Sequence, residues 1–315
     1  MLIWVAKNLG NMDIYEQLRS KLKEAVERSR ADGILLSGGL DTSILAFVAR
    51  PSTGFTVALK DSLASDLGYS EKIAELLGIQ HKKMEFTTEE ALATLPEAIG
   101  ILKTFDLALP NDLAIYFALK LARESGIGSI MTGDGADELF AGYSYMAELP
   151  PEDLERYIRR LSQNWHFSAN EFGRVLGIGI KQPFLDEDFA RFALEIGPEL
   201  KVKDGVGKYI LRKSFEDLIP AEIVWRGKEP IEHGSGSTRL HEIIDGMVTD
   251  EEFQSARKAV DIKFINKEHF FYWRIYDRVV GEIPRARADE ISCPCCGAAI
   301  GKYHCPTCGF SRPLS

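Results

Sequence analysis

A seven-residue run near the start of the chain has the composition of an anion-binding turn. Ser37-Gly38-Gly39-Leu40-Asp41-Thr42-Ser43 follows the apolar run Ile34–Leu36 and opens a pattern typical of a helix. Glycines let the backbone approach an oxyanion, and the first amides of a helix, which lack partners within the helix, point at it. The run does not end in the Gly-Lys-Ser/Thr of a Walker A loop. An ordinary strand–helix turn is the alternative for Ser-Gly-Gly alone, but Asp41 and the two hydroxyls after it favour a phosphate-binding loop.

A second run places three carboxylates after a predicted strand: Thr132-Gly133-Asp134-Gly135-Ala136-Asp137-Glu138-Leu139-Phe140-Ala141-Gly142-Tyr143. Carboxylates clustered there are costly unless a cation binds, and Mg²⁺ usually takes one or two carboxylates together with substrate phosphates. Asp41 and Asp137 would form such a pair. The alternative is a turn in which Asp137 or Glu138 is favoured by the dipole of a helix that starts there.

The elements that must position these runs alternate between strand and helix. Strands are expected at Ile34–Leu36, Phe55–Leu59, Lys82–Phe86 and Ser129–Met131, with helices at Ile14–Val26, from Thr42, and at Tyr69–Leu77, Glu89–Ile101 and Leu113–Glu124. This order predicts an α/β fold with a parallel, doubly wound sheet. Ligands bind at the carboxyl ends of such strands, where Ser37, Val57 and Thr132 would cluster.

Beyond Leu149 strand signals vanish, which predicts a helical second half. The helical patterns cover Pro151–Leu161, Ala169–Leu176, Glu187–Ile196, Lys208–Leu218, Glu251–Ala259 and Lys267–Val280. We expect a nucleotide-binding α/β part over residues 1–149, a helical part over residues 150–283 and a small C-terminal domain over residues 289–315.

All five cysteines lie between Cys293 and Cys308, which favours one local metal site over a disulfide scaffold. Two Cys-x-x-Cys-Gly knuckles supply four thiolates that can close a structural, tetrahedral Zn²⁺ site of the zinc-ribbon type: Cys293, Cys296, Cys305 and Cys308. So small a segment lacks a core of its own, and metal binding would supply about 10 kcal/mol or more of folding energy. Free thiols or an iron site are the alternatives, and Cys295 or His304 could replace a ligand. Such ribbons often contact nucleic acid or protein, here through Lys302, Tyr303 and Arg312.

Charge and composition limit the class of protein. The 315 residues carry a formal net charge of -9, which argues against a large nucleic-acid footprint. The start of the chain lacks the pattern of a signal peptide, and no apolar run approaches the ~18 residues of a membrane span. We therefore expect a cytoplasmic protein with no membrane partner.

Five ordered motifs together resemble the synthetase part of asparagine synthetases, which are N-type ATP pyrophosphatases related in fold to β-lactam synthetases. The motifs are Ser37–Ser43, Thr132–Tyr143, Lys181–Asp186, Gly207–Arg212, and Trp225–Pro230 with Gly234–Gly236. Their order and spacing match from about Asp13 to Val280. The resemblance implies that the side-chain carboxylate of aspartate attacks the α-phosphate of ATP, which gives β-aspartyl-AMP and pyrophosphate, and that ammonia then displaces AMP.

The resemblance also implies roles for individual residues. The pyrophosphate would be held by Ser37, Gly38, Gly39, Asp41, Thr42 and Ser43. Asp41 and Asp137 would bind Mg²⁺, Leu36 and Val57 would contact adenine, and Thr132 and Gly133 would lie beside the adenylate.

Two residues are the catalytic candidates. Lys228 would neutralise charge that develops as pyrophosphate leaves, although a solvated surface lysine is the alternative. Asp134, where many members have Glu, would orient the intermediate or help to deprotonate the attacking ammonium. Lys208 is a further phosphate candidate.

Several other polar residues in these motifs stay undecided. Asp186 is either a cap and structural anchor or an aspartate-binding group. Asp106, Asn111 and Asp112 match a family segment of open role, and His233 is treated as a loop residue.

Glutamine-dependent members begin with a glutaminase domain whose nucleophile is a cysteine directly after the initiator Met. Position two is Leu2 here, and the synthetase pattern starts almost at once, so we expect the synthetase part without that domain. Ammonia would be free or come from a separate glutaminase subunit. A homodimer stays open.

Two other functions stay open at this point. One is a tRNA-modifying ATP pyrophosphatase that uses the ribbon to bind RNA or a partner; the acidic charge and the lack of cysteine in the first 292 residues oppose it. The other is a non-catalytic adaptor, which the intact phosphate loop and acidic run oppose.

Overall fold

The computed structural model describes residues 12–163, 166–301 and 304–312, and the predictions that concern Leu2, Lys302 and Tyr303 lie outside them. These residues form two compact units. The first contains the chain up to Thr56, Asp66–Lys83 and Ala118–Glu229; the second contains Val57–Ser65, Met84–Phe117 and the chain from Pro230 onward. Each unit draws on several separate segments of the chain. The domain boundaries proposed from the sequence stay predictions.

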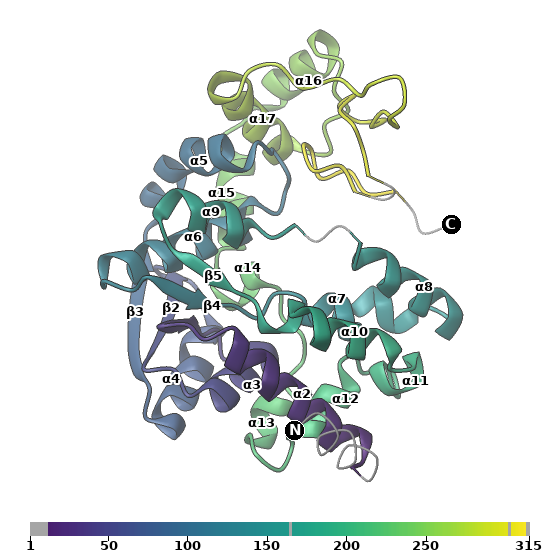
Figure 1. Ribbon diagram of the computed structural model, residues 1–315. Helices are drawn as coiled ribbons and strands as arrows, with labels where there is room; N and C mark the ends of the chain where they lie inside the picture. The colour runs from purple at the N-terminus through teal and green to yellow at the C-terminus, as the bar shows by residue number, and fades with distance from the viewer. Residues whose placement is uncertain (1–11, 164–165, 302–303, 313–315) are drawn as a thin grey trace. The chain divides into compact units, whose positions relative to one another are not determined.

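A five-stranded sheet runs in the order β3-β2-β1-β4-β5 (Figure 1). The strands are β1 (Gly33–Leu35), β2 (Thr53–Leu59), β3 (Gln80–Phe86), β4 (Ser129–Met131) and β5 (Gly179–Lys181). The central strand β1 pairs in parallel with both β2 and β4, so that Ile34 is opposite Gly54 on one side and Met131 on the other. The predicted parallel sheet is confirmed.

Strand β5 corrects the expectation that no strand follows Leu149. It pairs in parallel with β4, and Ile180 is opposite Ile130. Its three residues, Gly-Ile-Lys, are too few to show a strand pattern, and only their position beside β4 makes them a strand. This strand carries Gln182, the residue directly after it, to the same edge of the sheet as Thr132.

Helices and short 3₁₀ turns fill most of the remaining chain. They are α2 (Ile14–Arg28), α3 (Leu40–Ala49), α4 (Ser65–Leu77), α5 (Thr88–Leu102), α6 (Leu109–Glu124), α7 (Ala136–Phe140), η1 (Ser144–Glu148), α8 (Pro151–Leu161), α9 (Ser168–Leu176), η2 (Pro183–Leu185), α10 (Glu187–Glu195), α11 (Pro198–Lys201), α12 (Tyr209–Phe215), α13 (Ala221–Val224), α14 (Ile231–Gly234), α15 (Arg239–Gly246), α16 (Asp250–Ala259) and α17 (Lys267–Val279).

The first unit is organised around α2. Asp13 caps this helix by accepting the Glu16 N–H at 2.8 Å, as its position before the apolar pattern predicts. Leu18 and Leu22 of α2 are fully buried in one cluster with Ile210 and Leu211 of α12. This core holds α12 in place, and α12 begins directly after Lys208.

Helix α12 is shorter than its pattern predicts. Lys208 has a φ of 55°, in the left-handed region, so the helix begins at Tyr209 rather than at Lys208, and it ends at Phe215 rather than at Leu218. The unusual backbone at Lys208 aims its side chain into the site described below.

The second unit pairs α5 with α17. A capping box at Thr87 and Glu90 starts α5, and aromatic rings fill the interior of the unit, where Phe86 stacks on Phe117 at 4.5 Å and Phe105 meets Tyr276 edge-on at 5.2 Å. The sequence patterns predict α16 and α17 but not α14 and α15, because these two helices are short and bury few apolar side chains.

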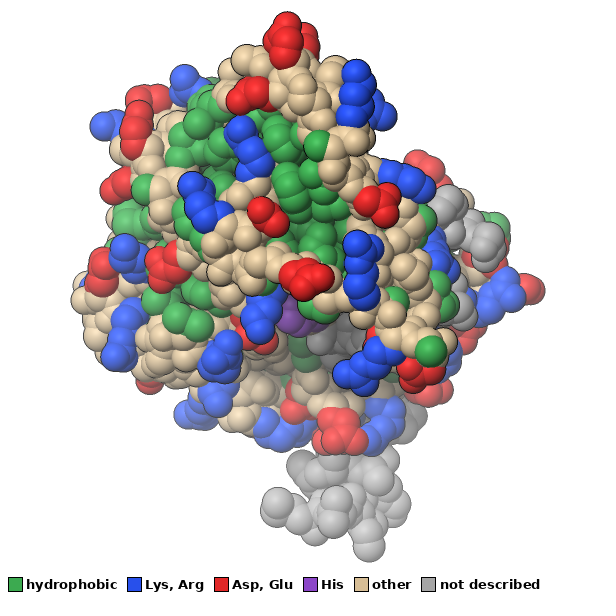
Figure 2. Space-filling model, turned by 90° about the horizontal axis from the view of Figure 1, so that it is seen from above, with side chains coloured by type: hydrophobic (Ala, Val, Ile, Leu, Met, Phe, Trp, Pro, Cys, Tyr) green, Lys and Arg blue, Asp and Glu red, His purple; other side chains and the backbone are tan. Residues whose placement is uncertain are grey.

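No helix among the described residues is long and apolar enough to cross a membrane. Acidic and basic side chains are interspersed on the face drawn in Figure 2.

Gly38 lies where the predicted phosphate loop, Ser37–Ser43, meets α4, and it provides a test of how that loop packs. Its φ is +68°, and a Cβ added there would lie 2.5 Å from the Ser70 nitrogen. Gly78 has nearly the same φ, +66°, with nothing within 4 Å. We expect Gly78→Ala to lower the free energy of unfolding by about 1 kcal/mol through backbone strain, and Gly38→Ala to lower it by about 2–4 kcal/mol because strain and overpacking add. Urea unfolding measures both; equal losses would contradict the close contact.

Candidate active site and cysteine centre

The predicted phosphate loop, Ser37–Ser43, is held in shape by hydrogen bonds of its own hydroxyl groups. The Thr42 Oγ1 accepts the Ser37 N–H at 3.3 Å and lies 3.1 Å from the Ser37 Oγ, which in turn accepts the Gly39 N–H at 3.2 Å. Gly39 is the N-cap of α3 but offers no side-chain cap, so the first amides of α3 have no partner from that position. The predicted junction of strand, glycine turn and helix is present.

Two acidic side chains from the first turns of separate helices, Asp41 of α3 and Asp137 of α7, share one lysine in the first unit. The Lys208 Nζ lies 2.6 Å from the Asp41 Oδ2 and 2.7 Å from the Asp137 Oδ1, and the Lys208 side chain is only 4% exposed. The Lys228 Nζ lies 2.6 Å from the second Asp137 oxygen, Oδ2. Asp41, Lys208, Asp137 and Lys228 therefore form a continuous chain of alternating charges.

Close backbone approach makes this charge chain possible. The Lys208 N–H donates to the Phe140 carbonyl at 2.8 Å, which ties the start of α12 to the end of α7. A Cβ on Gly142 would overlap both the Asp137 carboxylate and the Lys208 side chain. Gly142 is thus required by space, a reason that the sequence motif alone does not reveal.

Burial and charge oppose each other at this cluster. Burial raises the pKa of Asp137, but Lys208 and Lys228 outweigh it and hold that pKa at about 2. Burial lowers the pKa of Lys208, but the carboxylates of Asp137 and Asp41 raise it above its usual value. Asp137 and Lys208 are therefore both charged near neutral pH, so that their charges compensate each other.

Asp134 lies apart from the lysines. Its Oδ2 accepts hydrogen bonds from the Thr132 hydroxyl at 2.7 Å and from the Gln182 side-chain amide at 2.8 Å. Burial raises the pKa of Asp134, and these two hydrogen bonds oppose the shift. The sequence analysis assigned no role to Gln182, because no local pattern predicts a contact between residues 48 positions apart in the chain.

The acidic run contains a second, separate pair. The Tyr143 hydroxyl donates to the Glu138 Oε1 at 2.6 Å. Burial raises the pKa of Glu138. The Lys228 ammonium also lies 5.7 Å from the centroid of the Tyr143 ring.

The segment that carries Lys228 is held through Arg226, by contacts of its side chain and of its backbone carbonyl. The Arg226 guanidinium pairs with Asp66 at 3.2 Å, with Glu229 at 2.5 Å, and lies over the Tyr69 ring at 4.1 Å. The Arg212 Nη1 donates to the Arg226 carbonyl at 3.0 Å. The sequence analysis did not predict the ion pair between Asp66 and Arg226.

Other predicted residues have structural partners. Asp186 pairs with Arg28 at 2.6 Å and accepts the Phe189 N–H at 3.2 Å, so it is the cap and anchor of α10. Asn111 accepts the Glu232 N–H at 2.6 Å. His233 is exposed.

The two residues predicted to contact adenine are buried, and so is Ser43, the last residue of the predicted phosphate loop. Leu36, directly after β1, and Val57, within β2, are both buried. Ser43 is fully buried, and its hydroxyl has no hydrogen-bond partner among the described residues. The ligand roles of these three residues stay predictions.

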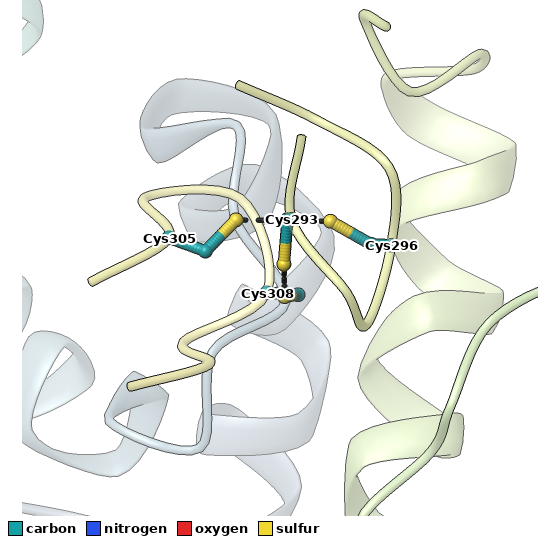
Figure 3. A group of neighbouring side chains, drawn as sticks. All are labelled: Cys293, Cys296, Cys305 and Cys308. Atoms are coloured by element: carbon teal, nitrogen blue, oxygen red, sulfur yellow. Dashed lines mark hydrogen bonds between the residues drawn. The ribbon is translucent and has the colours of Figure 1, made fainter. Parts of the chain in front are cut away.

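Four cysteine sulfurs converge in the second unit. The Sγ atoms of Cys293, Cys296, Cys305 and Cys308 all lie within 4.8 Å of one another and point toward a common centre (Figure 3). The Cys293–Cys308 and Cys296–Cys305 pairs are 3.6 and 3.7 Å apart. Four sulfurs on tetrahedral zinc, with Zn–S bonds of 2.3 Å, lie roughly 3.8 Å apart. The donor set and its spacing fit a tetrahedral metal.

The two other candidate ligands have different partners. The Cys295 Sγ donates to the Lys263 carbonyl at 3.2 Å. The His304 Nε2 lies 3.3 Å from the Asp106 Oδ2. The cluster therefore consists of the four predicted thiols without Cys295 or His304.

The cysteine segment docks on the corner between α5 and α6. The Thr307 carbonyl accepts the Phe105 N–H at 2.8 Å and the Thr104 hydroxyl at 3.2 Å. Asp106 pairs with His304 and also accepts the Ala108 N–H at 3.1 Å, just before α6. The corner and the cysteine segment thus share hydrogen bonds.

A family comparison decides the class of the chain. The model of the asparagine synthase family matches residues 17–178 and 154–271, which together make up most of the sequence. The chain belongs to the asparagine synthase family. The resemblance found in the motifs is confirmed. The four cysteines lie beyond the matched residues.

Curated asparagine synthases show the same relation. The chain is 31% identical over 284 residues to the glutamine-hydrolyzing asparagine synthetase of Mus musculus, across 82% of this chain and 50% of that protein. It is 30% identical over 326 residues to a probable glutamine-hydrolyzing asparagine synthetase of Schizosaccharomyces pombe, across 88% and 57%. The chain spans about half the length of these relatives.

Two solved structures are similar at low scores. The NMN synthetase of Francisella tularensis has a TM-score of 0.32 and 16% identity, over 87% of this chain and 97% of that one. The U34-tRNA thiolase NcsA of Methanococcus maripaludis, with its [4Fe-4S] cluster, has a TM-score of 0.31 and 14% identity, over 95% and 88%. Scores this low do not bear on the function of this chain.

The buried Asp66 gives a pH test of the segment that carries Lys228. Burial raises the pKa of Asp66 to about 6, although Arg226 lowers it in part. The folded protein therefore binds a proton more tightly than the unfolded chain, and this contribution to stability is present below pH 4 and is lost as the pH rises to 6. We expect the free energy of unfolding of the wild type, minus that of Asp66→Asn, to fall by on the order of 2 kcal/mol between pH 4 and 6. Denaturant titrations of both proteins at several pH values measure this difference. A difference that stays constant between pH 4 and 6 would contradict the prediction.

Proposed function

We propose that this protein is an ATP-dependent ligase that adenylates the side-chain carboxylate of aspartate and transfers ammonia to it. The observation that carries the proposal is the charge chain from Asp41 through Lys208 and Asp137 to Lys228. It joins the phosphate loop to the acidic run, as a site for a magnesium-bound triphosphate requires.

In the first half-reaction, a carboxylate oxygen of aspartate attacks the α-phosphorus of ATP and the bond to the β-phosphate oxygen breaks. The amides and hydroxyls of the loop from Ser37 to Thr42 hold the departing pyrophosphate. Lys228 neutralises the charge that develops there, and Lys208 supports it from the buried side. Most of the catalysis is positioning and charge neutralisation.

Asp41 and Asp137 are the residues that would hold Mg²⁺. The Asp41 Oδ1 is buried and accepts no hydrogen bond from the described residues, so it is a free hard ligand. Carboxylate oxygens of this kind fit the ion, which supplies further neutralisation of phosphate charge.

In the second half-reaction, Asp134 takes a proton from ammonium. The ammonia nitrogen then bonds to the acyl carbon, the acyl carbon–oxygen bond breaks, and AMP leaves with the electron pair. The nitrogen loses one further proton to solvent and becomes the amide. Burial raises the pKa of Asp134 and so makes its carboxylate a better base for this step.

Two sources of nitrogen fit the proposed reaction. The mouse and fission-yeast relatives are named for glutamine hydrolysis, and this chain matches about half of their length. Free ammonia and a separate glutaminase subunit both remain compatible with the site.

Label exchange between pyrophosphate and ATP tests the first half-reaction. We expect exchange that depends on added aspartate, because the adenylate forms reversibly. Asp41→Asn and Lys228→Ala should each lower it by about 100-fold or more, since a preorganised charge contact contributes several kcal/mol. Lys213→Ala is the matched control, because the ion-pair partner of Lys213 is Glu216 and not Asp41 or Asp137.

The same exchange assay with other small carboxylates in place of aspartate separates the alternative functions. If no small carboxylate stimulates exchange in the wild type, the ligase proposal fails. Exchange with a different carboxylate corrects the substrate and keeps the reaction. Salt-sensitive binding of tRNA, without exchange, would favour the tRNA-modifying function instead.

We further propose that the four-cysteine cluster binds one structural zinc ion. The sulfurs form a closed donor set, and the segment that carries them has little core of its own. Metal binding would therefore supply its folding energy and maintain its dock on Thr104 and Phe105.

Zinc removal tests this centre directly. The protein should contain one zinc per chain, Cys305→Ser should lose it, and Cys295→Ser should keep it because Cys295 lies outside the cluster. Loss of zinc should speed hydrogen exchange at the Phe105 amide, which donates to Thr307. Elemental analysis and peptide-level exchange measure these effects. Bound iron, or full protection of Phe105 without metal, would refute the assignment.

A further inference from the structure

The Asp134 carboxylate is held by one oxygen only. Its Oδ2 accepts both the Thr132 hydroxyl and the Gln182 amide. The other oxygen, Oδ1, has no hydrogen-bond partner among the described residues, and it is not fully buried. One oxygen is thus fixed from two sides, while the other is open to an incoming group.

The sheet brings the two donors together. Thr132 directly follows β4 and Gln182 directly follows β5, and the Thr132 N–H donates to the Lys181 carbonyl at 2.9 Å. Both side chains therefore start from the ends of paired strands. Because both strands are fixed by their ladder, the two hydrogen bonds set the rotation of the Asp134 carboxylate.

We propose that Gln182 is a positioning residue of the amide-forming half-reaction: it holds one oxygen of Asp134 and so turns the other toward the incoming ammonium. This inference rests on the proposed function. It extends that function to a residue whose contact is visible only in the folded chain.

The chemistry of the amide suits this task. A lysine or arginine at position 182 would bind the carboxylate as an ion pair and remove its basicity, whereas a neutral amide orients it and leaves its charge. The charged groups that face Asp134 are the carboxylates of Asp137 and Asp41, both of which raise its pKa. These two are themselves paired with Lys208, so the proton from ammonium has Asp134 as its acceptor.

The test compares the two half-reactions in Gln182→Leu, which keeps the approximate volume of the side chain and removes the donor. We expect amide formation from ammonia to fall about 10-fold or more, since a misplaced base loses much of its effect, while pyrophosphate exchange falls far less. Hydroxylamine, which is largely unprotonated at pH 7, should restore much of the rate because it needs no base. Gln80→Leu, at an exposed position in β3, is the control.

Two results would overturn the inference. One is an equal loss of exchange and amide formation, which would make Gln182 merely structural. The other is an unchanged rate of amide formation. A third arm needs no activity: Asp134→Ala should shift the NMR signals of the Gln182 side-chain amide, and Asp188→Ala, at an exposed carboxylate, should not. If the wild type lacks carboxylate-dependent exchange, the proposed function fails and the role of Gln182 with it, although the NMR contact would persist.

Discussion

Two carboxylates that approach each other at the edge of a sheet impose the main constraint on this molecule. Asp41 and Asp137 come from the first turns of α3 and α7, nearly a hundred positions apart in the chain, and each lies within 2.7 Å of the Lys208 ammonium. Buried like charges repel strongly unless cations compensate them. The fold meets this need with a nearly inaccessible lysine, with a left-handed backbone at Lys208 that aims it, and with a residue, Gly142, that has no side chain to block it. The phosphate loop, the acidic run and the start of α12 are therefore one electrostatic unit.

Precision at the site comes from neighbours that do no chemistry themselves. Arg226 lies two residues before Lys228 and is held by Asp66, Glu229 and the Tyr69 ring. An ion pair this well enclosed adds little net stability, but breaking it leaves an unpaired charge inside the protein. Its value here is geometric, because it restricts where the Lys228 ammonium can lie. Gln182 acts similarly on Asp134, through a neutral hydrogen bond instead of a charge.

Much of this arrangement could be predicted from local patterns, and the remainder could not. The alternation of strands and helices gave the parallel sheet, and the spacing of the cysteines identified all four sulfurs of the cluster, because both signals lie within short segments. Strand β5 escaped prediction because three residues carry no periodicity. The double contact of Lys208 escaped because it depends on a φ of 55° and on Gly142, which only the folded chain reveals. The motif left Asp186 open between a cap and an aspartate-binding group, and in the folded chain Arg28 and the start of α10 use both of its oxygens.

The cysteine centre shows how a segment outside the family region becomes part of a unit. Its sulfurs lie beyond the residues that the asparagine synthase model matches, and its dock uses the Thr307 carbonyl and His304 against Thr104, Phe105 and Asp106. The same corner leads into α6, where Asn111 holds the Glu232 N–H and the Pro110 carbonyl accepts the Ser237 hydroxyl. One short stretch of chain therefore supports both the cysteine segment and the residues that follow Lys228 in sequence. Because residues 104–111 make hydrogen bonds to both segments, they have little freedom to move. The order of the cysteine segment and the order of residues 230–238 therefore depend on the same backbone.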